Sequence, residues 1–141
     1  DGMELLPEEV VKDWSDQRAL PSPRRKGYEK TLAVFDELVP KMRAAGVELL
    51  ISPSDAPFCV PGKGYVIEAQ HLAKAGYSPA EILRMATLNG ARCQGEGTVR
   101  GAVQVGRVAD LVLLDGNPFE SVDALGEVSA VVMGGTVVVG R

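Results

Sequence analysis

The pattern of apolar and polar residues in the first part of the chain predicts three helices. The first, over residues 7–14, has Pro7 and acids in its first turn, and the second, over residues 28–45, carries apolar residues at helical spacing. The third, over residues 65–75, follows a glycine-bearing loop and ends at Gly76. Pro40 lies inside the second stretch, where a proline ring is expected to kink the helix or split it in two. The apolar positions that define this second helix are Leu32, Phe35, Leu38, Val39 and Met42.

A further helix has a distinct start at Ser78. Serine is a good N-cap, Pro79 suits the first helical position, and Glu81 stands three residues beyond the cap, so the three predict a capping box. Asn89-Gly90 interrupts the apolar pattern downstream, and we expect residues 91–93 to form a separate short turn. The buried side of the helix is predicted to consist of Ile82, Leu83, Met85 and Ala86.

A short apolar run, Leu49-Leu50-Ile51, is bounded by a glycine on one side and by serine and proline on the other. Such a run is typical of a strand buried on both faces of a parallel sheet, and we expect this strand over residues 47–52. Parallel strands present functional groups at their carboxyl ends, and the first acidic residue there is Asp55. A loop that includes Gly62–Gly64 and then a helix follow. The stretch therefore predicts one βα unit with a candidate functional group at the carboxyl end of its strand.

From Gly95 onward, glycines separate short β-branched runs. Strands are predicted over residues 102–105, 110–114, 128–133 and 136–139, and Gly134-Gly135 is expected to join the last two as a two-residue hairpin. Four short strands alone make a marginal unit. We therefore expect them to complete a sheet whose other strands lie elsewhere.

Composition narrows the class of protein. A chain of 141 residues suits one ordinary domain, or one small domain with a piece of a larger one. The formal net charge of −4 gives no indication of nucleic-acid binding, and no apolar stretch approaches the ~20 residues of a membrane span. Cys59 and Cys93 have no metal-type spacing, which favours a reducing compartment and a cytoplasmic location. No signal-peptide pattern opens the chain, although a signal upstream of this sequence is left open.

Five short motifs follow one another between residues 52 and 118. They are Ser52-Pro-Ser-Asp-Ala-Pro, Pro61-Gly-Lys-Gly-Tyr, Ala75-Gly-Tyr-Ser-Pro-Ala-Glu, Ala86-Thr-Leu-Asn-Gly-Ala-Arg and Gly106-Arg-Val-Ala-Asp-Leu-Val-Leu-Leu-Asp-Gly-Asn-Pro. In order and spacing they resemble the metal-dependent amidohydrolases of the imidazolonepropionase- and prolidase-like branch. The chain departs from that family at Ser52-Pro53-Ser54, where Gly-Thr is usual before the acid.

The resemblance implies an α/β fold in two parts. Residues 1–94 would be the C-terminal portion of a (β/α)8 barrel, comprising the last βα unit and the helices after it. Residues 95–141 would be strands of a small composite β-sandwich. A complete barrel needs ~200 residues or more, so the chain is expected to be part of a longer enzyme whose N-terminal barrel portion is its partner. A homo-oligomer is left open.

The resemblance gives Asp55 a role in hydrolysis. In the family, the acid at this position contacts a divalent metal and takes the proton from the attacking water. A metal lowers the pKa of bound water to about 7, and a nearby carboxylate can relay the proton to the leaving nitrogen. The implied function is cleavage of a C–N bond in an amide or cyclic amide of a small molecule. On the residues alone, Asp55 could instead accept backbone hydrogen bonds in an Asx turn.

The sequence does not contain a full set of metal ligands. A catalytic zinc site uses about three protein ligands, whereas the chain has one histidine, His71. We interpret His71, in the middle of a helix, as a packing or surface residue. The expected cofactor is a divalent metal, with zinc as the first choice, held mostly by residues upstream of Asp1. The chain alone is therefore expected to be inactive.

The loop at Gly62–Gly64 has two interpretations. In the first, Cys59, Lys63 and Tyr65 bind the substrate, with Lys63 meeting a carboxylate; the alternatives are a solvated lysine and a buried, unreactive cysteine. In the second, the chain is a non-catalytic α+β binding or interaction module, and the glycine loop before a helix holds an anion.

Two further acids match positions of the family. Glu68 is expected to bind the loop backbone or to stabilise the N-terminal end of its helix. Asp110, beside a predicted strand, is interpreted as structural, fixing the sandwich against the barrel.

Overall fold

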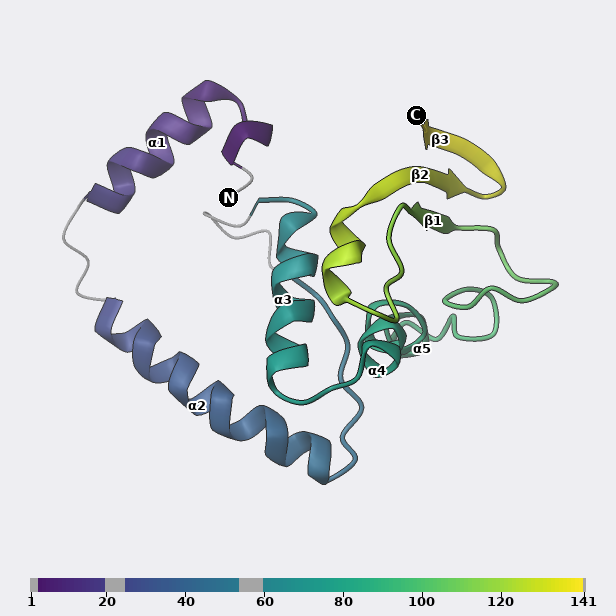
Figure 1. Cartoon of the computed structure of the whole chain (residues 1–141), viewed down its shortest axis with the longest axis horizontal. Coiled ribbons are helices and arrows are strands. Elements are labelled where there is room, and N and C mark those ends of the chain that lie inside the picture. The colour runs from purple at the N-terminus through teal and green to yellow at the C-terminus, as the bar shows by residue number, and fades with distance from the viewer. Residues whose placement is uncertain (1–2, 20–24, 54–59, 141) are drawn as a thin grey trace.

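The computed structural model describes residues 3–19, 25–53 and 60–140. Within these ranges the helices come first and a three-stranded antiparallel sheet comes last (Figure 1). No helix in the described ranges combines the length and the apolar character needed to cross a membrane. The α/β architecture with a small sheet agrees with the prediction. The predicted division of the chain after residue 94 stays a prediction.

The N-terminal helices follow the predicted helical pattern. A 3-10 turn, η1 (Met3–Leu5), precedes α1 (Glu8–Ala19), and α2 (Arg25–Ala44) comes next. Pro40 lies inside α2, which is nonetheless assigned as one helix, so the predicted split does not occur. The helix stops at Gly46, whose φ of 71° is the left-handed conformation that favours glycine at a C-terminal cap.

The strand predicted over residues 47–52 is not formed. Residues 47–53 have no regular secondary structure, because a strand requires a neighbouring strand to share its hydrogen bonds. The described part of the chain places helical residues beside this segment instead, and the backbone N–H of Ile51 donates to the Met85 carbonyl at 3.2 Å. The predicted burial is correct at Ile51, which is 3% exposed.

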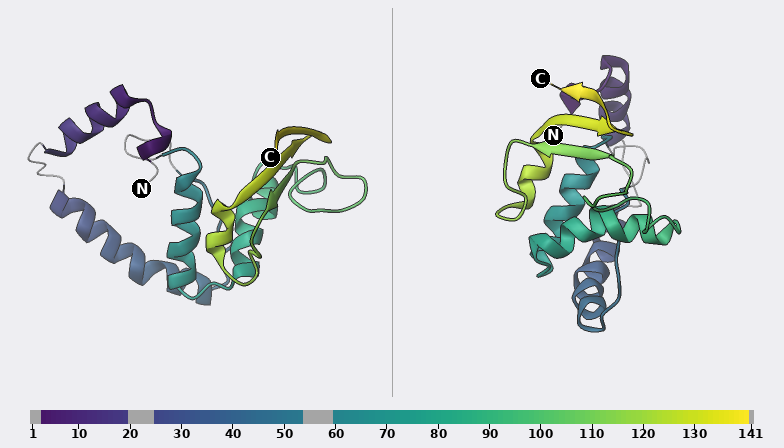
Figure 2. Two further views of the ribbon diagram at one scale, coloured as in Figure 1. Left: turned by 45° about the horizontal axis from the view of Figure 1, so that its top comes forward. Right: turned by 90° about the vertical axis from the view of Figure 1, so that its right-hand side faces the viewer.

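The helix after this segment, α3 (Lys63–Lys74), begins at Gly62, whose φ is 80°. Figures 1 and 2 show α3 between α2 and the 3-10 turn η3 (Val122–Gly126). α3 packs against η3, and the side chain of Gln70 donates to Asp123 Oδ1 at 2.7 Å. This bond joins the helical part of the chain to the segment that leads into the sheet.

The predicted capping box is confirmed. α4 (Pro79–Arg84) starts after Ser78, whose backbone N–H donates to Glu81 Oε2 at 2.7 Å, while the Ser78 hydroxyl accepts from the Glu81 N–H at 3.3 Å. The interruption predicted at Asn89-Gly90 is wrong. Helical structure continues through a π-helical turn, η2 (Met85–Asn89), into α5 (Gly90–Cys93), because Gly90 keeps right-handed angles, with φ −60° and ψ −46°.

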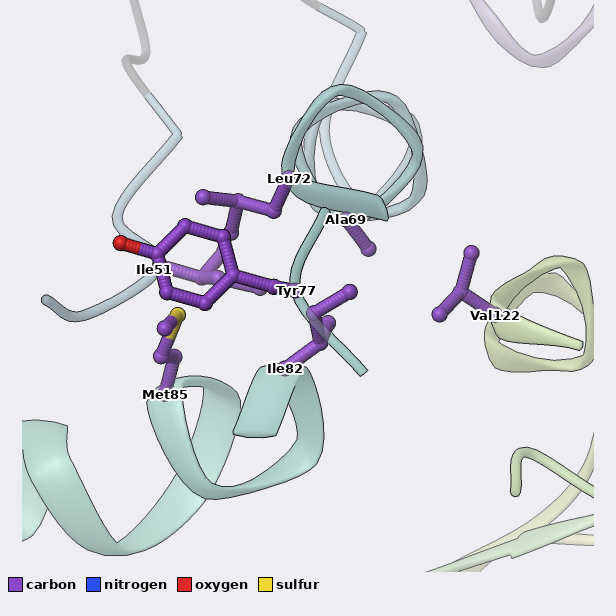
Figure 3. Packing of buried hydrophobic residues seen from close by; sticks show 7 residues of the cluster. All are labelled: Ile51, Ala69, Leu72, Tyr77, Ile82, Met85 and Val122. Carbon is purple, nitrogen blue, oxygen red and sulfur yellow. The ribbon is translucent and has the colours of Figure 1, made fainter. Parts of the chain in front are cut away.

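The core lies where α3, α4 and η2 meet the 47–53 segment and η3. Ile82 of α4 is fully buried at its centre. Figure 3 shows Val122 pointing from η3 toward Ile82 and Ala69, while Tyr77 lies over Met85. The buried cluster consists of Ile51, Ala69, Leu72, Tyr77, Ile82, Met85 and Val122.

The sheet contains β1 (Leu111–Leu114), β2 (Val128–Met133) and β3 (Thr136–Gly140) in that order. The predicted hairpin is confirmed: Gly134 and Gly135 have φ of 55° and 85°, and a type I′ turn needs positive φ at both positions. The strand predicted over residues 102–105 is wrong. That stretch belongs to a loop between α5 and β1 in which Val103 is 89% exposed, and none of the described strands pairs with it.

Candidate functional site

Two of the four residues predicted to form the site, Asp55 and Cys59, lie outside the described residues. The other two belong to the first turn of α3. Lys63 is its first residue and is exposed. Tyr65 is 38% exposed, and its hydroxyl donates to the Ile51 carbonyl at 3.3 Å. Tyr65 therefore contacts the segment that leads to Asp55, while one part of its ring stays open to solvent.

The segment from Leu49 to Ser52 is held by residues that come later in the chain. The Leu49 carbonyl accepts from Asn89 Nδ2 at 2.7 Å, and the Ile51 N–H donates to the Met85 carbonyl at 3.2 Å. Both partners belong to η2, whereas Tyr65 reaches the same segment from α3. Hydrogen bonds that a neighbouring strand would otherwise make are thus supplied by two helical elements.

Glu68, one turn after Tyr65 on α3, reaches the same segment. Partial burial raises the pKa of its carboxyl group, and a hydrogen bond from the Ser52 backbone acts in the opposite direction. The predicted contact of Glu68 with the backbone of the loop that ends at Gly64 stays a prediction, because Ser52 precedes that loop. Ser52 stands three residues before Asp55.

Asn89 is a buried polar residue that the sequence did not single out as functional. It is 9% exposed, and its Oδ1 atom is buried without a hydrogen-bond partner among the described residues. The hydroxyl of Tyr77 is in the same state. Both residues line a cavity of about 200 Å³ that also borders Leu49 and Met85. The available signal was spacing: Asn89 follows Ile82 by seven residues and Met85 by four, on the buried side of the helix.

Charges surround the same cavity. Arg43, near the end of α2, pairs with Glu81 at 3.3 Å, and its guanidinium lies 5.3 Å from the centroid of the Tyr77 ring. The backbone N–H and hydroxyl of Ser78, followed by Arg43, lower the pKa of Glu81 from 4.5 to about 2. These contacts join the end of α2 to the start of α4.

The described residues do not make a metal site by themselves. Across residues 3–19, 25–53 and 60–140, no group of three or more His, Cys, Asp and Glu side chains could hold a metal ion. His71 is exposed on α3, where it borders a groove of about 450 Å³ between α2 and α3 together with Glu68 and Phe35. This placement agrees with the interpretation of His71 as a surface residue.

Asp110 is bound within the C-terminal part of the chain. Its Oδ1 accepts from the Gly134 N–H at 2.8 Å, and its Oδ2 pairs with Arg100 at 3.3 Å. The residue therefore connects the β2–β3 turn to the loop before β1, which is a structural role. A contact between Asp110 and a barrel stays a prediction.

Known proteins resemble this chain in both sequence and fold. Imidazolonepropionase of Syntrophobacter fumaroxidans (strain DSM 10017 / MPOB) is 39% identical over 75 residues, which are 50% of this chain and 18% of that protein. A putative prolidase from Bifidobacterium longum superposes with a TM-score of 0.77 at 25% identity, over 97% of this chain and 33% of the other. A Xaa-Pro dipeptidase with bound methionine superposes with a TM-score of 0.77 at 22% identity, over 94% of this chain and 32% of the other.

These matches also show how much longer the related proteins are than this chain. The chain spans about a third of the two solved structures and 18% of the imidazolonepropionase. At 22% identity, the likeness to the dipeptidase bears on the fold alone. A model of the amidohydrolase family matches residues 1–139. Because that match takes in nearly the whole sequence, the chain belongs to the amidohydrolase family.

Proposed function

We propose that this chain is the C-terminal part of a metal-dependent hydrolase that cleaves the C–N bond of an amide or cyclic amide in a small molecule. The observation that carries the proposal is the amidohydrolase family match over residues 1–139. The relatives named imidazolonepropionase and prolidase support the choice of bond. The rest of the (β/α)8 barrel and most metal ligands would come from upstream of this chain, and the chain alone would be inactive.

In this proposal Asp55 carries a proton during the reaction. Its carboxylate accepts the proton from the attacking water and delivers it to the leaving nitrogen. A divalent metal, with zinc as the first choice, would supply a lowered water pKa and a polarised carbonyl group. The described donors do not fit such a metal on their own, so Asp55 would be one ligand among others from upstream.

Three residues around the loop would bind the substrate. The exposed ammonium group of Lys63, at the start of α3, would pair with a substrate carboxylate. Cys59 and the open part of the Tyr65 ring would contact the rest of the molecule. Lys63→Ala should then raise KM more than it lowers kcat, because it removes binding that is equal in the ground and transition states.

The test uses the full-length protein that contains this chain. Purified protein is assayed against a cyclic amide of the imidazolone type and a panel of Xaa-Pro dipeptides, with release of the amine or acid as the readout. We expect Asp55→Asn to lower kcat on the order of 10²–10⁴-fold. Asp36→Asn, at an exposed position of α2, is the matched control and should leave kcat unchanged. Full activity of Asp55→Asn would overturn the role of Asp55.

The proposed partner of this chain is the upstream part of the same protein. The sheet supports this, because apolar side chains of β3 are exposed all along the strand, with Val137 at 64%, Val138 at 51% and Val139 at 59%. A three-stranded sheet with exposed apolar residues and a free edge is a marginal unit that other chain segments usually cover. A cytoplasmic location, which the cysteine usage favours, is part of the same proposal.

A further inference from the structure

We infer that Asn89 is a positioning residue: it fixes residues 49–52 and thereby sets the course of the chain toward Asp55. The inference rests on the proposed function, because its effect on catalysis depends on the proposed role of Asp55. Asn89 itself would touch neither the substrate nor the reacting atoms.

The contact of Asn89 with this segment is short and well shielded. Its Nδ2 atom lies 2.7 Å from the Leu49 carbonyl oxygen, and the side chain is 9% exposed. The two residues are 40 positions apart in the chain. Because residues 47–53 have no neighbouring strand in the described ranges, the amide of Asn89 takes a place that strand pairing would otherwise fill.

Other contacts, from η2 and α3, hold Ile51 within the same segment. Ile51 is bound at its N–H by the Met85 carbonyl and at its carbonyl by the Tyr65 hydroxyl. The side chain of Ile51 enters the core beside Leu72 and Tyr77 (Figure 3). Within this set, Asn89 contributes a buried side-chain donor, and it holds the upstream end of the segment, at Leu49.

The unpartnered side-chain oxygen of Asn89 indicates that the residue acts here through its N–H donor and not through its acceptor. Asn89 Oδ1 is buried without a partner among the described residues, and burying an unpaired acceptor lowers stability. Leucine has a similar size and would avoid the loss at Oδ1, but it would also leave the Leu49 carbonyl without its donor. The N–H donor to Leu49 is therefore what asparagine provides at this position and an apolar residue of the same size does not.

The experiment substitutes Asn89→Leu in the full-length protein and measures three quantities. We expect the melting temperature to stay close to that of the wild type, because the variant loses the bond to the Leu49 carbonyl but no longer buries the unpaired Oδ1. We expect amide hydrogen exchange in residues 48–53 to become faster, and kcat to fall on the order of 10–100-fold with KM nearly unchanged, because a small misplacement near the reacting groups is costly. Thr87→Val is the control, since it removes an exposed hydroxyl that donates to the Leu83 carbonyl from the same turn.

The outcomes separate this inference from the proposed function. Wild-type kcat in Asn89→Leu, or a loss of activity matched by an equal loss of folded protein, would overturn the positioning role. If the wild-type protein hydrolyses none of the substrates, the proposed function fails, and the exchange rate of residues 48–53 still decides whether Asn89 fixes them. If Asn89→Leu does not fold, Asn89→Ala is measured in the same way.

Discussion

At the scale of single residues, Glu81 shows how several weak contacts act on one carboxylate. Its Oε2 accepts from the backbone N–H and hydroxyl of Ser78 and from Arg43, and its Oε1 accepts from Arg43. All of these contacts favour the charged form, and they lower its pKa from 4.5 to about 2. The Glu81 side chain is not buried, so its lowered pKa comes from these partners and not from a low dielectric.

Glu81 should therefore contribute a pH-dependent part of the stability. A pKa that is lower in the folded state stabilises the protein above the unfolded-state pKa near 4.5, and this stabilisation is lost as the pH falls through about 2. We expect Glu81→Gln to lower the melting temperature at pH 7 and to have little effect at pH 2. Thermal unfolding across this range measures it, with Glu37→Gln on α2 as an exposed control. A difference that stays constant with pH would contradict the linkage.

At the scale of secondary-structure elements, Ile82 shows what joins the helices. It is fully buried on α4, in a cluster that contains residues of α3 and η3. Ile82→Ala should reduce the free energy of unfolding by about 2–5 kcal/mol, because the neighbours can only partly fill the space. Ile67→Ala, at a position on α3 that is 51% exposed, is the control and should change it by about 0.5 kcal/mol or less. Chemical denaturation measures both, and equal losses would refute the assignment of the core.

Substituting alanine for each of two glycines should change the free energy of unfolding in opposite directions. Gly90 has right-handed helical angles and open space around its Cα, so Gly90→Ala should increase the free energy of unfolding by about 0.5–1 kcal/mol. Gly135 has a φ of 85° in the β2–β3 turn, so Gly135→Ala should decrease it by about 1–2 kcal/mol. Denaturant titrations of the two variants test the pair. A loss of stability in Gly90→Ala would show that the π-helical turn does not tolerate a stiffer backbone.

The elements also show which predictions a single sequence can support. Local signals were sufficient for the capping box at Ser78 and for the Gly134-Gly135 hairpin, because each depends on neighbouring residues only. The apolar run at residues 49–51 correctly indicated burial at Ile51, but a strand also requires a partner, which local sequence does not supply. The same reason explains residues 102–105. The interruption expected at Gly90 failed because continuing helical hydrogen bonds outweighed its weak propensity.

At the scale of the whole molecule, the candidate site was predicted only in part. The helix with Tyr65 and Glu68 could be found from the sequence, whereas the role of Asp55 stays a prediction. The role of Asn89 could not be found in this way, because its contact with Leu49 joins positions 40 residues apart. In the sequence, a polar residue on an apolar helix face only interrupts the pattern, and its role becomes visible once its partner elsewhere in the fold is known.

The exposed apolar sheet leads to a prediction about the complete protein. If the upstream part covers β3, then Val138→Lys should lower the melting temperature of the full-length protein, because it buries a charge. Val103→Lys, in the exposed loop before β1, should have little effect. Light scattering on the same samples shows whether the upstream part or a second copy of the protein covers this face. Dissociation of a dimer by Val138→Lys would assign the face to a second copy. An unchanged melting temperature and mass would show that the face is open to water.

The order of the segments along the chain has a consequence for synthesis on the ribosome. Leu49 leaves the exit tunnel 40 residues before Asn89 does. At about 5–20 residues per second, this delay lasts about 2–8 seconds. For that interval the stretch around Leu49 has no amide from Asn89 to bind, so this part of a nascent chain would be open to chaperones and to mispairing until Asn89 emerges.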